Sequence, residues 1–388
     1  MRLSIQTQKL VAEGAYQVLS KANELEKKGR NIIHFEIGQP DFPTPGNISR
    51  SAIEAIKQGK TKYNPPLGIF QLREAVANHV SNSRQVDVSP NMVAITPSGK
   101  TAIFAAMAAI LNPGDEVIYP DPGFPTYNTL TDFFGAQKRP VPLLEENNFS
   151  FNMEVFLKQF SSKTKLIILN SPSNPTGGVI PLEDLKTIAR VVSGSNCWIL
   201  TDEIYSWILY GDQVFKSIYS LPKMAQRTIL VDSFSKTYSM TGWRLGYLIM
   251  PEIYIEKMDY LLTNMVGCTA TFTQYAGLEA LNGSQLGIKK MISEFEKRRN
   301  YLVGELNNIK GVSCQMPEGA FYVFPNIKRL KKRSSEIADY LLKEVGVSLL
   351  PGTAFGKYGE GYLRISYANS MENLKEGVRR IREAIDKI

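Results

Sequence analysis

Polar and charged side chains follow four short, apolar, β-rich runs of this sequence. These residues are Ser98, Gly99 and Lys100 after residues 92–96, Asn174 after 165–170, Asp202 and Tyr205 after 197–201, and Ser233, Ser235 and Lys236 after 228–232. Polar groups are costly to bury without a partner. If the runs are parallel strands, their carboxyl ends meet at one edge of a sheet, where ligands of such folds bind. The pattern therefore predicts one site for a polar, multiply charged ligand.

Each of these residues also has an ordinary structural explanation. The segment SGKTA at 98–102 is no P-loop, because Ala94 stands where the first glycine of that motif is required, and an NTPase site is excluded. Gly99 at a helix start could seat a phosphate, since free N–H groups and the helix dipole favour an anion. Asp202 could simply cap a helix, and Lys236 could be an exposed loop lysine. Their occurrence together at successive strand ends is what favours a ligand site.

The elements that must position these residues alternate between short strands and helices. Near-continuous apolar strands separated by helical stretches predict a largely parallel sheet that is covered by helices on both faces. From about residue 285, a long helical stretch, short strands and a final helix predict a smaller α+β domain. We expect an N-terminal segment at 1–48 that joins the small domain, a large domain at 49–285 and the small domain at 286–388.

The composition is that of a globular protein, because 43% of the 388 residues are hydrophobic and 21% are charged. The formal net charge of +8 is scattered along the chain. Only residues 327–333 cluster several basic side chains, and we interpret them as a solvated face. This balance suits a small anionic substrate or cofactor better than a nucleic acid.

The cysteines and the apolar runs indicate where the protein works. The three cysteines are odd in number and widely spaced, with no CxxC pair, which fits a reducing compartment. Residues 1–16 lack an apolar signal core, and the longest apolar run, 102–111, is too short to span a bilayer. We therefore expect a cytoplasmic protein that binds neither membranes nor nucleic acids.

A motif around the lysine at 236 identifies the kind of ligand. The segment SFSKTYSMTGWRLGY at 233–247 closely resembles the cofactor-lysine signature of class I aminotransferases, which are pyridoxal 5′-phosphate enzymes of fold type I. Five further segments match that family in the expected order: EIGQPDF (36–42), KYNPPLGIFQLREA (62–75), NSPSNPTGG (170–178), TDEIY (201–205) and YLRISYA (362–368). The chain is most similar to prokaryotic aspartate and aromatic aminotransferases. The resemblance implies a fold type I α/β architecture with a mostly parallel seven-stranded sheet in the large domain and a smaller α+β domain.

The resemblance also implies how the chain holds pyridoxal 5′-phosphate. Lys236 would bind the cofactor aldehyde and then act as the catalytic base, provided that burial and nearby cations keep its amine neutral. Arg244 would grip the phosphate, since a guanidinium pairs with phosphate in a planar fork. The other candidates around the phosphate are Ser98, Gly99, Lys100, Ser233 and Ser235.

Four residues are implied to contact the cofactor ring. Asp202 would face the pyridine nitrogen and keep it protonated, which makes the ring a better electron sink. Tyr205 and Asn174 would hydrogen-bond the phenolic oxygen of the ring. Phe124, in PDPGFPTY at 120–127, matches an aromatic residue that stacks on the ring.

Substrate and partner contacts follow from the same resemblance. Arg364 matches the arginine that binds the α-carboxylate, where two parallel hydrogen bonds would orient the substrate Cα. Gly38 and Asn174 would lie beside the same carboxylate. Lys100 matches a lysine that binds the distal carboxylate in some aspartate-type members, but residues 12–16, AEGAY, lack the Ser or Thr that those members carry, so the side-chain preference stays open. Tyr63 matches a tyrosine that reaches the phosphate in the neighbouring subunit, which implies a homodimer.

Other functions remain as alternatives. The same lysine, aspartate and arginine serve β-eliminating lyases and related synthases. A non-catalytic ligand sensor with an aminotransferase-like domain is a second alternative, although such proteins usually carry an additional DNA-binding segment. Two histidines without a metal motif and the lack of GxGxxG after a strand count against metal sites and nicotinamide dehydrogenases. We predict an aminotransferase that works by a ping-pong mechanism, moving an amino group from an L-amino acid to a 2-oxo acid such as 2-oxoglutarate or pyruvate.

Overall fold

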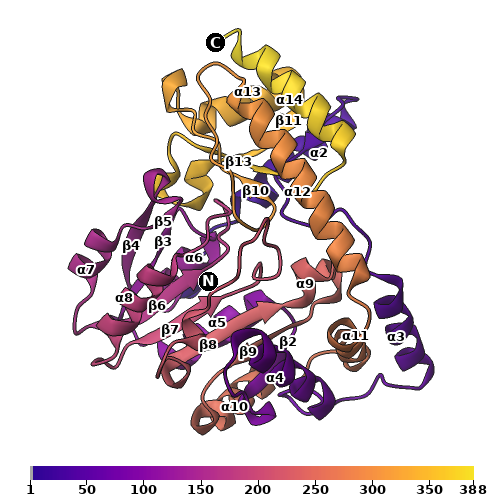
Figure 1. Ribbon diagram of the computed structural model, residues 1–388, viewed down its shortest axis with the longest axis vertical. Helices are drawn as coiled ribbons and strands as arrows, with labels where there is room; N and C mark the ends of the chain where they lie inside the picture. The colour runs from indigo at the N-terminus through magenta and orange to yellow at the C-terminus, as the bar shows by residue number, and fades with distance from the viewer. Residues whose placement is uncertain (1–2) are drawn as a thin grey trace.

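The computed structural model describes residues 3–388 as a large α/β unit and a smaller unit packed above it (Figure 1). Residues 1 and 2, which belong to the N-terminal segment expected at 1–48, lie outside the described residues. The expected division at residues 48 and 285 stays a prediction, but the α/β class and the smaller α+β region are confirmed.

The large unit is built on one mixed sheet with the strand order β2-β9-β8-β7-β6-β3-β4-β5. Its strands are β2 (Val93–Thr96), β3 (Glu116–Asp121), β4 (Gln137–Leu144), β5 (Ser150–Phe151), β6 (Thr164–Asn170), β7 (Trp198–Asp202), β8 (Thr228–Ser233) and β9 (Gly246–Ile249). The neighbours from β8 to β4 pair in parallel, whereas β9 and β5 pair antiparallel with their neighbours. The expected count of seven strands was wrong, because the two-residue strand β5 adds an eighth at the edge. So short a strand has no alternating pattern that sequence reasoning could detect.

Helices cover both faces of this sheet, as its doubly buried strands require. One face packs against α5 (Gly99–Ile110), α6 (Pro125–Phe133) and α10 (Ile255–Met265). The other face packs against α4 (Phe70–Arg84), α7 (Met153–Gln159), α8 (Leu182–Val192) and α11 (Thr271–Asn282). Alternate residues separate the two faces, since Ile167 and Ile199 join the second core while Leu166 and Leu200 join the first.

The helix α5 illustrates why these segments fold as they do. Its sequence, GKTAIFAAMAAI, is rich in alanine, the strongest helix former. The Ser98 side chain caps its first turn by accepting a hydrogen bond from the Thr101 N–H at 3.0 Å. The start of α5 is thus fixed at the carboxyl end of β2, and its free N–H groups face the edge of the sheet.

The smaller unit combines three helices with short strands. The antiparallel strands β10 (Tyr322–Val323), β13 (Leu363–Ser366) and β12 (Leu350–Pro351) form one sheet. The helices are α12 (Leu286–Asn307), α13 (Ser334–Val345) and α14 (Met371–Ile385). Figure 1 shows α12 running from beside α11 and α3 (Gly46–Lys57) up into this unit. Its core includes Phe295, Phe321 and Tyr367.

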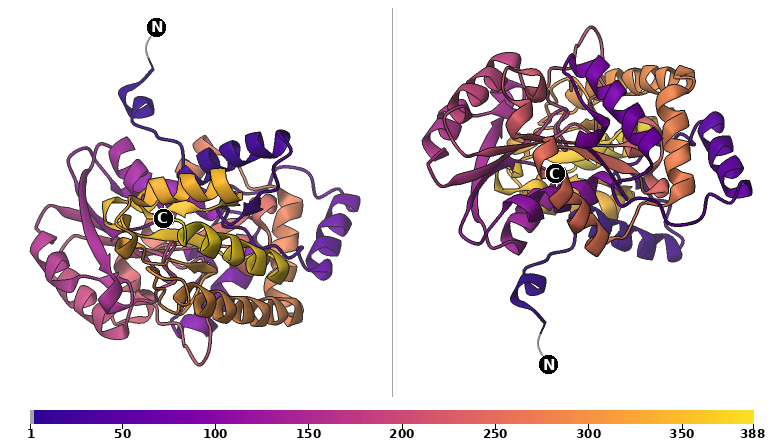
Figure 2. Two further views of the ribbon diagram at one scale, coloured as in Figure 1. Left: turned by 90° about the horizontal axis from the view of Figure 1, so that it is seen from above. Right: turned by 90° about the horizontal axis from the view of Figure 1, so that it is seen from below.

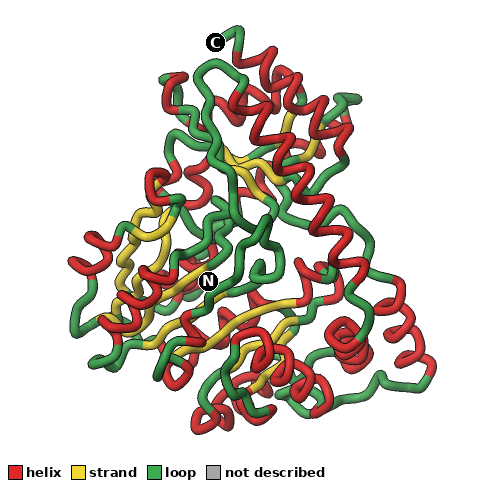
Figure 3. The backbone as a smooth tube through the Cα atoms, in the orientation of Figure 1, coloured by secondary structure: helices red, strands yellow, loops and turns green. Residues whose placement is uncertain are grey.

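The N-terminal segment packs with the smaller unit. The strand β1 (Ile33–His34) pairs in parallel with β11 (Val347–Ser348), and α2 (Gly14–Lys27) contacts β11 and β12. The short helix α1 (Ile5–Gln8) lies away from the main body of the molecule (Figure 2). Figure 3 shows that loops fill the region between the large sheet and the three-stranded sheet. Farther along the N-terminal segment, Glu13 pairs with Lys100, which follows β2 at the carboxyl ends of the large sheet.

Candidate active site

A cavity of about 550 Å³ lies at the carboxyl ends of the central strands. All but one of the residues predicted for the site line it: Gly38, Ser98, Gly99, Lys100, Phe124, Asn174, Asp202, Tyr205, Ser233, Ser235, Lys236, Arg244 and Arg364. A neighbouring cavity of about 690 Å³ shares Glu13 and Phe124 but not the lysine at 236. The smaller cavity is therefore the candidate active site, since the residues able to do chemistry converge there.

Lys236 lies in the short helix α9 (Phe234–Thr237), directly after β8. Its Nζ atom donates a hydrogen bond to the carbonyl oxygen of Gly38. The pKa of Lys236 is lowered from 10.5 to about 8, chiefly by burial and also by the charges of Arg364, Lys100 and Arg244, while the charge of Asp202 acts in the opposite direction. A substantial fraction of this amine is therefore unprotonated slightly above neutral pH, as a nucleophile or base must be.

Gly38 leaves no room for a side chain at this point. A Cβ atom there would come within 2.1 Å of the hydroxyl oxygen of Tyr322. Only glycine therefore lets the backbone lie between Tyr322 and the amine of Lys236.

Asp202 ends the strand β7 and is buried. Its Oδ2 atom accepts a hydrogen bond from the hydroxyl of Tyr127 at 2.7 Å, and its Oδ1 atom accepts one from the N–H of Ile204 at 3.2 Å. Burial raises the pKa of Asp202 to about 6, while the Tyr127 hydroxyl acts in the opposite direction. A cationic nitrogen facing this carboxylate would favour its ionised form.

Two asparagines hold the loop that follows β6. The Asn170 side chain donates to the carbonyl oxygen of Asp202 at 3.1 Å and accepts from the N–H of Asn174 at 2.9 Å. The Asn174 side-chain oxygen in turn accepts a hydrogen bond from Nη1 of Arg364 at 3.2 Å. These contacts link the end of the large sheet to β13 in the smaller unit.

Arg364, in β13, is buried and only partly paired. Its Nη2 atom donates to the backbone oxygen of Glu36, and its guanidinium carbon lies 4.6 Å from the ring centroid of Tyr322. Its Nε atom has no hydrogen-bond partner within residues 3–388. A buried cation with a free donor indicates an anionic ligand, because unsatisfied buried groups of this kind are rare.

Two tyrosine hydroxyls meet beside this arginine. The hydroxyl oxygens of Tyr205 and Tyr322 lie 2.7 Å apart. Burial raises the pKa of both phenols, and that of Tyr205 lies well above its ordinary value of 10. Both hydroxyls therefore stay protonated at physiological pH, and because one donates to the other, the accepting hydroxyl keeps its proton for a ligand oxygen.

The polar groups at the start of α5 form a cradle of a size and chemistry that suit a phosphate. The Ser233 hydroxyl oxygen lies 2.8 Å from that of Ser235, and a Cβ atom on Gly99 would come within 3.2 Å of the Ser233 Cβ atom. A Cβ atom on Gly246 would come within 2.6 Å of the Gly99 nitrogen, so β9 packs directly on the helix start. Arg244 is exposed beside this cradle. Backbone N–H groups, hydroxyls and one guanidinium are the donors that a phosphate prefers.

Pyridoxal 5′-phosphate therefore fits the residues of this cavity on structural grounds. The cradle offers donors for its phosphate, and the amine of Lys236 with its lowered pKa suits its aldehyde. The buried carboxylate of Asp202 suits its pyridine nitrogen.

Phe124 and Lys100 lie toward the mouth of the cavity. The Phe124 ring packs edge-on against Tyr127 with 5.7 Å between ring centroids, and Lys100 Nζ lies 5.3 Å from the Phe124 centroid. The Lys100 ammonium also forms an ion pair with Glu13, at the start of α2. The ammonium is thus already neutralised by a residue of this chain.

Tyr63 is the predicted residue that the structure does not bring into the cavity. Its side chain is 96% exposed in the loop between α3 and α4. The prediction placed this side chain in a partner's site, so its position in one chain leaves that prediction open.

Sequence reasoning missed four residues of the site: Glu13, Tyr127, Asn170 and Tyr322. Tyr127 carried a usable signal, because it follows Phe124 by three residues and so lies on the same helix face. Asn170 stands at the end of an apolar strand, as Asp202 does. Glu13 lies in the segment 12–16 that the sequence comparison singled out, but no role was assigned to it there, whereas Tyr322 reaches the cavity through long-range packing, for which the local sequence holds no signal.

Two further observations concern other kinds of site. Within residues 3–388, no group of three or more His, Cys, Asp or Glu side chains is arranged to hold a metal ion. Over the same residues, no helix combines the length and the apolar character that crossing a bilayer requires.

Comparisons with known proteins agree in one family. The family model described as "Aminotransferase class I and II" matches residues 30–381. A probable aspartate/prephenate aminotransferase of Aquifex aeolicus is 40% identical over 96% of this chain and 95% of its own length. The aromatic-amino-acid aminotransferase 2 of Thermococcus litoralis is 39% identical over 95% of both chains. The solved structure of the Thermus thermophilus aspartate aminotransferase with maleate superposes with a TM-score of 0.94 at 34% identity, covering 99% of this chain and 100% of that one.

Proposed function

This chain belongs to the class I and II aminotransferases, and on that premise we propose which of its residues carry out the reaction. The family is dependent on pyridoxal 5′-phosphate, and the chain is an enzyme that transfers an amino group from an amino acid to a 2-oxo acid. When bound, the cofactor supplies an aldehyde that accepts the amino group and a ring that withdraws electrons from the substrate Cα.

Lys236 is the proposed catalytic residue. Its amine would hold the cofactor covalently and, once released by the substrate, would move a proton from the substrate Cα. The observation that carries this proposal is the position of the amine in the cavity that Asp202 and Arg364 also line, with its pKa lowered to about 8. A neutral amine is what both tasks require.

The other proposed cofactor contacts come from residues that line the same cavity. Asp202, held by Tyr127, would keep the ring nitrogen protonated, because a buried carboxylate favours a cation beside it. Asn174 and Tyr205 would donate to the phenolic oxygen, and Phe124 would stack on the ring. The phosphate would be bound by Ser98, Gly99, Ser233, Ser235 and Arg244 and by the backbone N–H of Lys100, whose ammonium is paired with Glu13.

Arg364 would bind the α-carboxylate of the substrate. Its unpaired Nε atom and its forked geometry suit a carboxylate, and this pairing would fix the substrate Cα near the amine of Lys236. Gly38 and Asn174 border the same position and would complete the carboxylate site.

We also propose a cytoplasmic homodimer. Ile53 and Ile56 on α3, Tyr63 in the loop after it and Phe70 at the start of α4 are all exposed. Large exposed apolar side chains of this kind are suited to a protein interface. In the dimer, Tyr63 would reach the cofactor phosphate of the partner chain.

A half-reaction tests the proposed function. The loaded enzyme, given an L-amino acid and no acceptor, should release one equivalent of 2-oxo acid per site and then stop. A second 2-oxo acid should restore activity, which is the signature of a ping-pong mechanism. Continuous product release without an acceptor would instead indicate a lyase. The variant Lys236→Ala should lose both the covalent attachment of the cofactor and turnover, and retained turnover would refute the role of this lysine.

A further inference from the structure

We propose that Glu13 is a specificity-determining residue that makes the side-chain end of the site favour substrates with an uncharged side chain over dicarboxylic substrates. This inference rests on the proposed function, because it assumes that amino acids bind in the cavity with their α-carboxylate on Arg364. It concerns the group at the other end of the substrate.

Glu13 lies between two helices of the large unit. Glu13 precedes the helix α2, and its carboxylate forms an ion pair with Lys100 in the first turn of α5. The same Oε1 atom lies 3.4 Å from the hydroxyl of Thr126, which can donate to it. The carboxylate is thus held between donors from α5 and α6, and these contacts fix Glu13 in the wall of the cavity.

The ion pair changes what Lys100 can do. An unpaired ammonium at this position would attract the distal carboxylate of a four- or five-carbon dicarboxylate. Here an internal carboxylate already occupies the ammonium, so a second carboxylate meets a negative charge as well as a positive one. To bind Lys100, the distal carboxylate of a ligand must displace Glu13, which breaks the ion pair, or bind beside Glu13, where the two negative charges repel one another. Either way, the affinity for a dicarboxylate is lowered.

The remaining surroundings favour an uncharged side chain. Ala15, Tyr16, Ile37 and Phe124 line the same cavity beside Glu13. Tyr16 is largely exposed, which leaves its ring available to cover a bound side chain. An aromatic or aliphatic substrate could contact these groups without separating Glu13 from Lys100.

Glu13 also acts on the opposite end of the site. Burial lowers the pKa of Arg364, and the negative charge of Glu13 is among the charges that raise it. The two groups therefore lie within electrostatic reach of one another, as expected for residues at the two ends of one substrate site.

The ion pair is partly open to solvent, which sets the size of the effect. The side chain of Lys100 is 48% exposed and that of Glu13 is 24% exposed. Water screens such a pair, so a dicarboxylate is disfavoured but not excluded. We expect removal of the Glu13 charge to change dicarboxylate affinity about tenfold, the scale of one partly screened charge.

Ligand binding to the holoenzyme tests this inference without relying on turnover. The two ligands are maleate, a dicarboxylate, and 3-phenylpropionate, an aromatic monocarboxylate. Neither carries an amino group, so neither can react, and calorimetry measures the Kd of each. Glu13→Gln should bind maleate about tenfold more tightly than the wild type, while its Kd for 3-phenylpropionate stays within about twofold. In Lys100→Gln the maleate affinity should fall, because Glu13 is left without its counter-charge. Adding Glu13→Gln to that variant should recover part of the loss but should not reach the affinity of Glu13→Gln alone, which keeps the ammonium.

The matched control is Glu24→Gln, which removes the same charge from an exposed position of the same helix. It should leave both Kd values unchanged, and an equal gain in this variant would overturn the inference by showing a general charge effect. Equal losses of both ligands in Glu13→Gln would also overturn it, because Glu13 would then only position the segment. If neither ligand competes with an amino acid in any variant, the proposed substrate site itself is wrong. If the ratio of the two Kd values is the same in Glu13→Gln as in the wild type, only the role of Glu13 is refuted.

Discussion

The amine of Lys236 is the residue on which the proposed chemistry depends, and its environment sets how it titrates. Burial is the largest cause of its lowered pKa, and three nearby guanidinium and ammonium groups add to the effect. A lysine in an exposed loop would keep its proton at neutral pH. The burial that favours catalysis must therefore cost stability when the amine is charged.

This cost predicts a pH dependence of stability for the cofactor-free protein. The pKa of Lys236 falls from 10.5 in an exposed lysine to about 8 in the folded chain, so the unfolded chain binds more protons between these values. The free energy of unfolding should rise with pH through that window, by at most about 3 kcal/mol from this residue. Lys236→Met should lack this contribution. Urea unfolding of both proteins at about pH 8 and about pH 10 measures the difference, and identical pH dependences would contradict the lowered pKa.

Tyr127 is expected to position and tune Asp202. Its hydroxyl donates to the carboxylate at 2.7 Å and lowers the pKa that burial raises. Tyr127→Phe should therefore raise the pKa of Asp202 and move the acidic limb of the kcat/KM profile to higher pH. The control is Tyr119→Phe, whose hydroxyl instead donates to Asn128. A profile that keeps its shape, or that shifts equally in the control, would limit Tyr127 to a packing role.

The residues of the site differ in how far the sequence could predict them. Lys236, Asp202 and Arg364 stand in local motifs, and the structure gathers all three in one cavity. Tyr322 hydrogen-bonds Tyr205 across 117 positions of sequence, and Glu13 pairs with Lys100 across 87. Contacts of that kind arise only when separate elements pack together, so no local sequence pattern predicts them.

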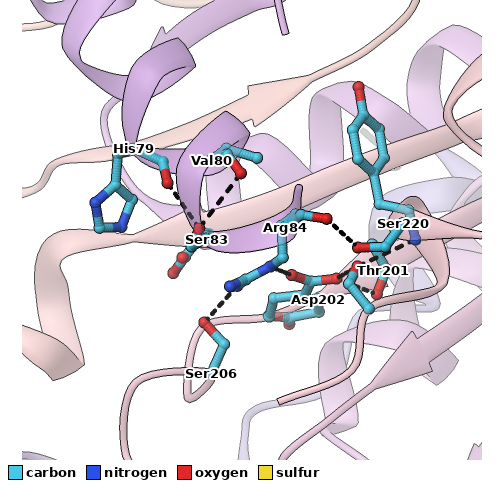
Figure 4. Close-up of polar contacts among 12 residues, drawn as sticks. His79, Val80, Ser83, Arg84, Thr201, Asp202, Ser206 and Ser220 are labelled. Atoms are coloured by element: carbon cyan, nitrogen blue, oxygen red, sulfur yellow. Dashed lines mark hydrogen bonds and ion pairs between the residues drawn. The ribbon is translucent and has the colours of Figure 1, made fainter. Parts of the chain in front are cut away.

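A buried ion pair joins two elements behind the site. Arg84, at the end of α4, donates from Nε to Glu203 at 2.9 Å and from Nη2 to Ser206 at 2.8 Å (Figure 4). Glu203 follows Asp202 directly, and its other oxygen accepts hydrogen bonds from Thr201 and Ser217. The turn that follows Asp202, at the end of β7, is thus tied to α4 through one pair of charges.

Breaking this pair should destabilise the protein strongly. Arg84→Met leaves Glu203 buried without its counter-charge, which typically costs about 3–5 kcal/mol. We expect a clearly lower Tm by circular dichroism, and partial recovery in Arg84→Met combined with Glu203→Gln. The control is Lys158→Met, which breaks a pair with Glu154 in which the two side chains are 73% and 76% exposed. Exposed pairs contribute about 0–1 kcal/mol, so equal losses in both variants would refute the importance of burial.

The central strands of the large sheet were predicted better than the strands near its edges. The apolar runs at 92–96, 165–170, 197–202 and 228–233 all became strands of the large sheet. Continuous apolar runs bounded by polar residues predict such strands, because a central strand of a parallel sheet is buried on both faces. The two residues of β5 were missed, since their pairing depends on the position of β4. The antiparallel direction of β9 is likewise set by packing between neighbours.

At the scale of the whole molecule, the site lies between the large and the smaller unit, and residues of the N-terminal segment also line it. Arg364 comes from the smaller unit, whereas Lys236 and Asp202 come from the large one. The hydrogen bond from Arg364 to Asn174 crosses between them. Substrate bound to Arg364 and positioned near Lys236 would therefore contact both units. Composition and length predicted two domains, but only the motifs related the second domain to the site.

The exposed Tyr63 predicts active sites that are shared between two chains. If Tyr63 serves the partner's site, Tyr63→Ala should weaken cofactor affinity, and Lys236→Ala should be inactive. A mixed dimer of the two variants would contain one site with both defects and one with both wild-type residues. Co-expression or subunit exchange should therefore restore turnover at limiting cofactor well above the average of the separate variants. Sedimentation first establishes that the chain is a dimer, and wild type diluted with Lys236→Ala provides the reference for simple averaging. Activity equal to that average would show that each site is built from one chain alone, because mixing could then create no intact site.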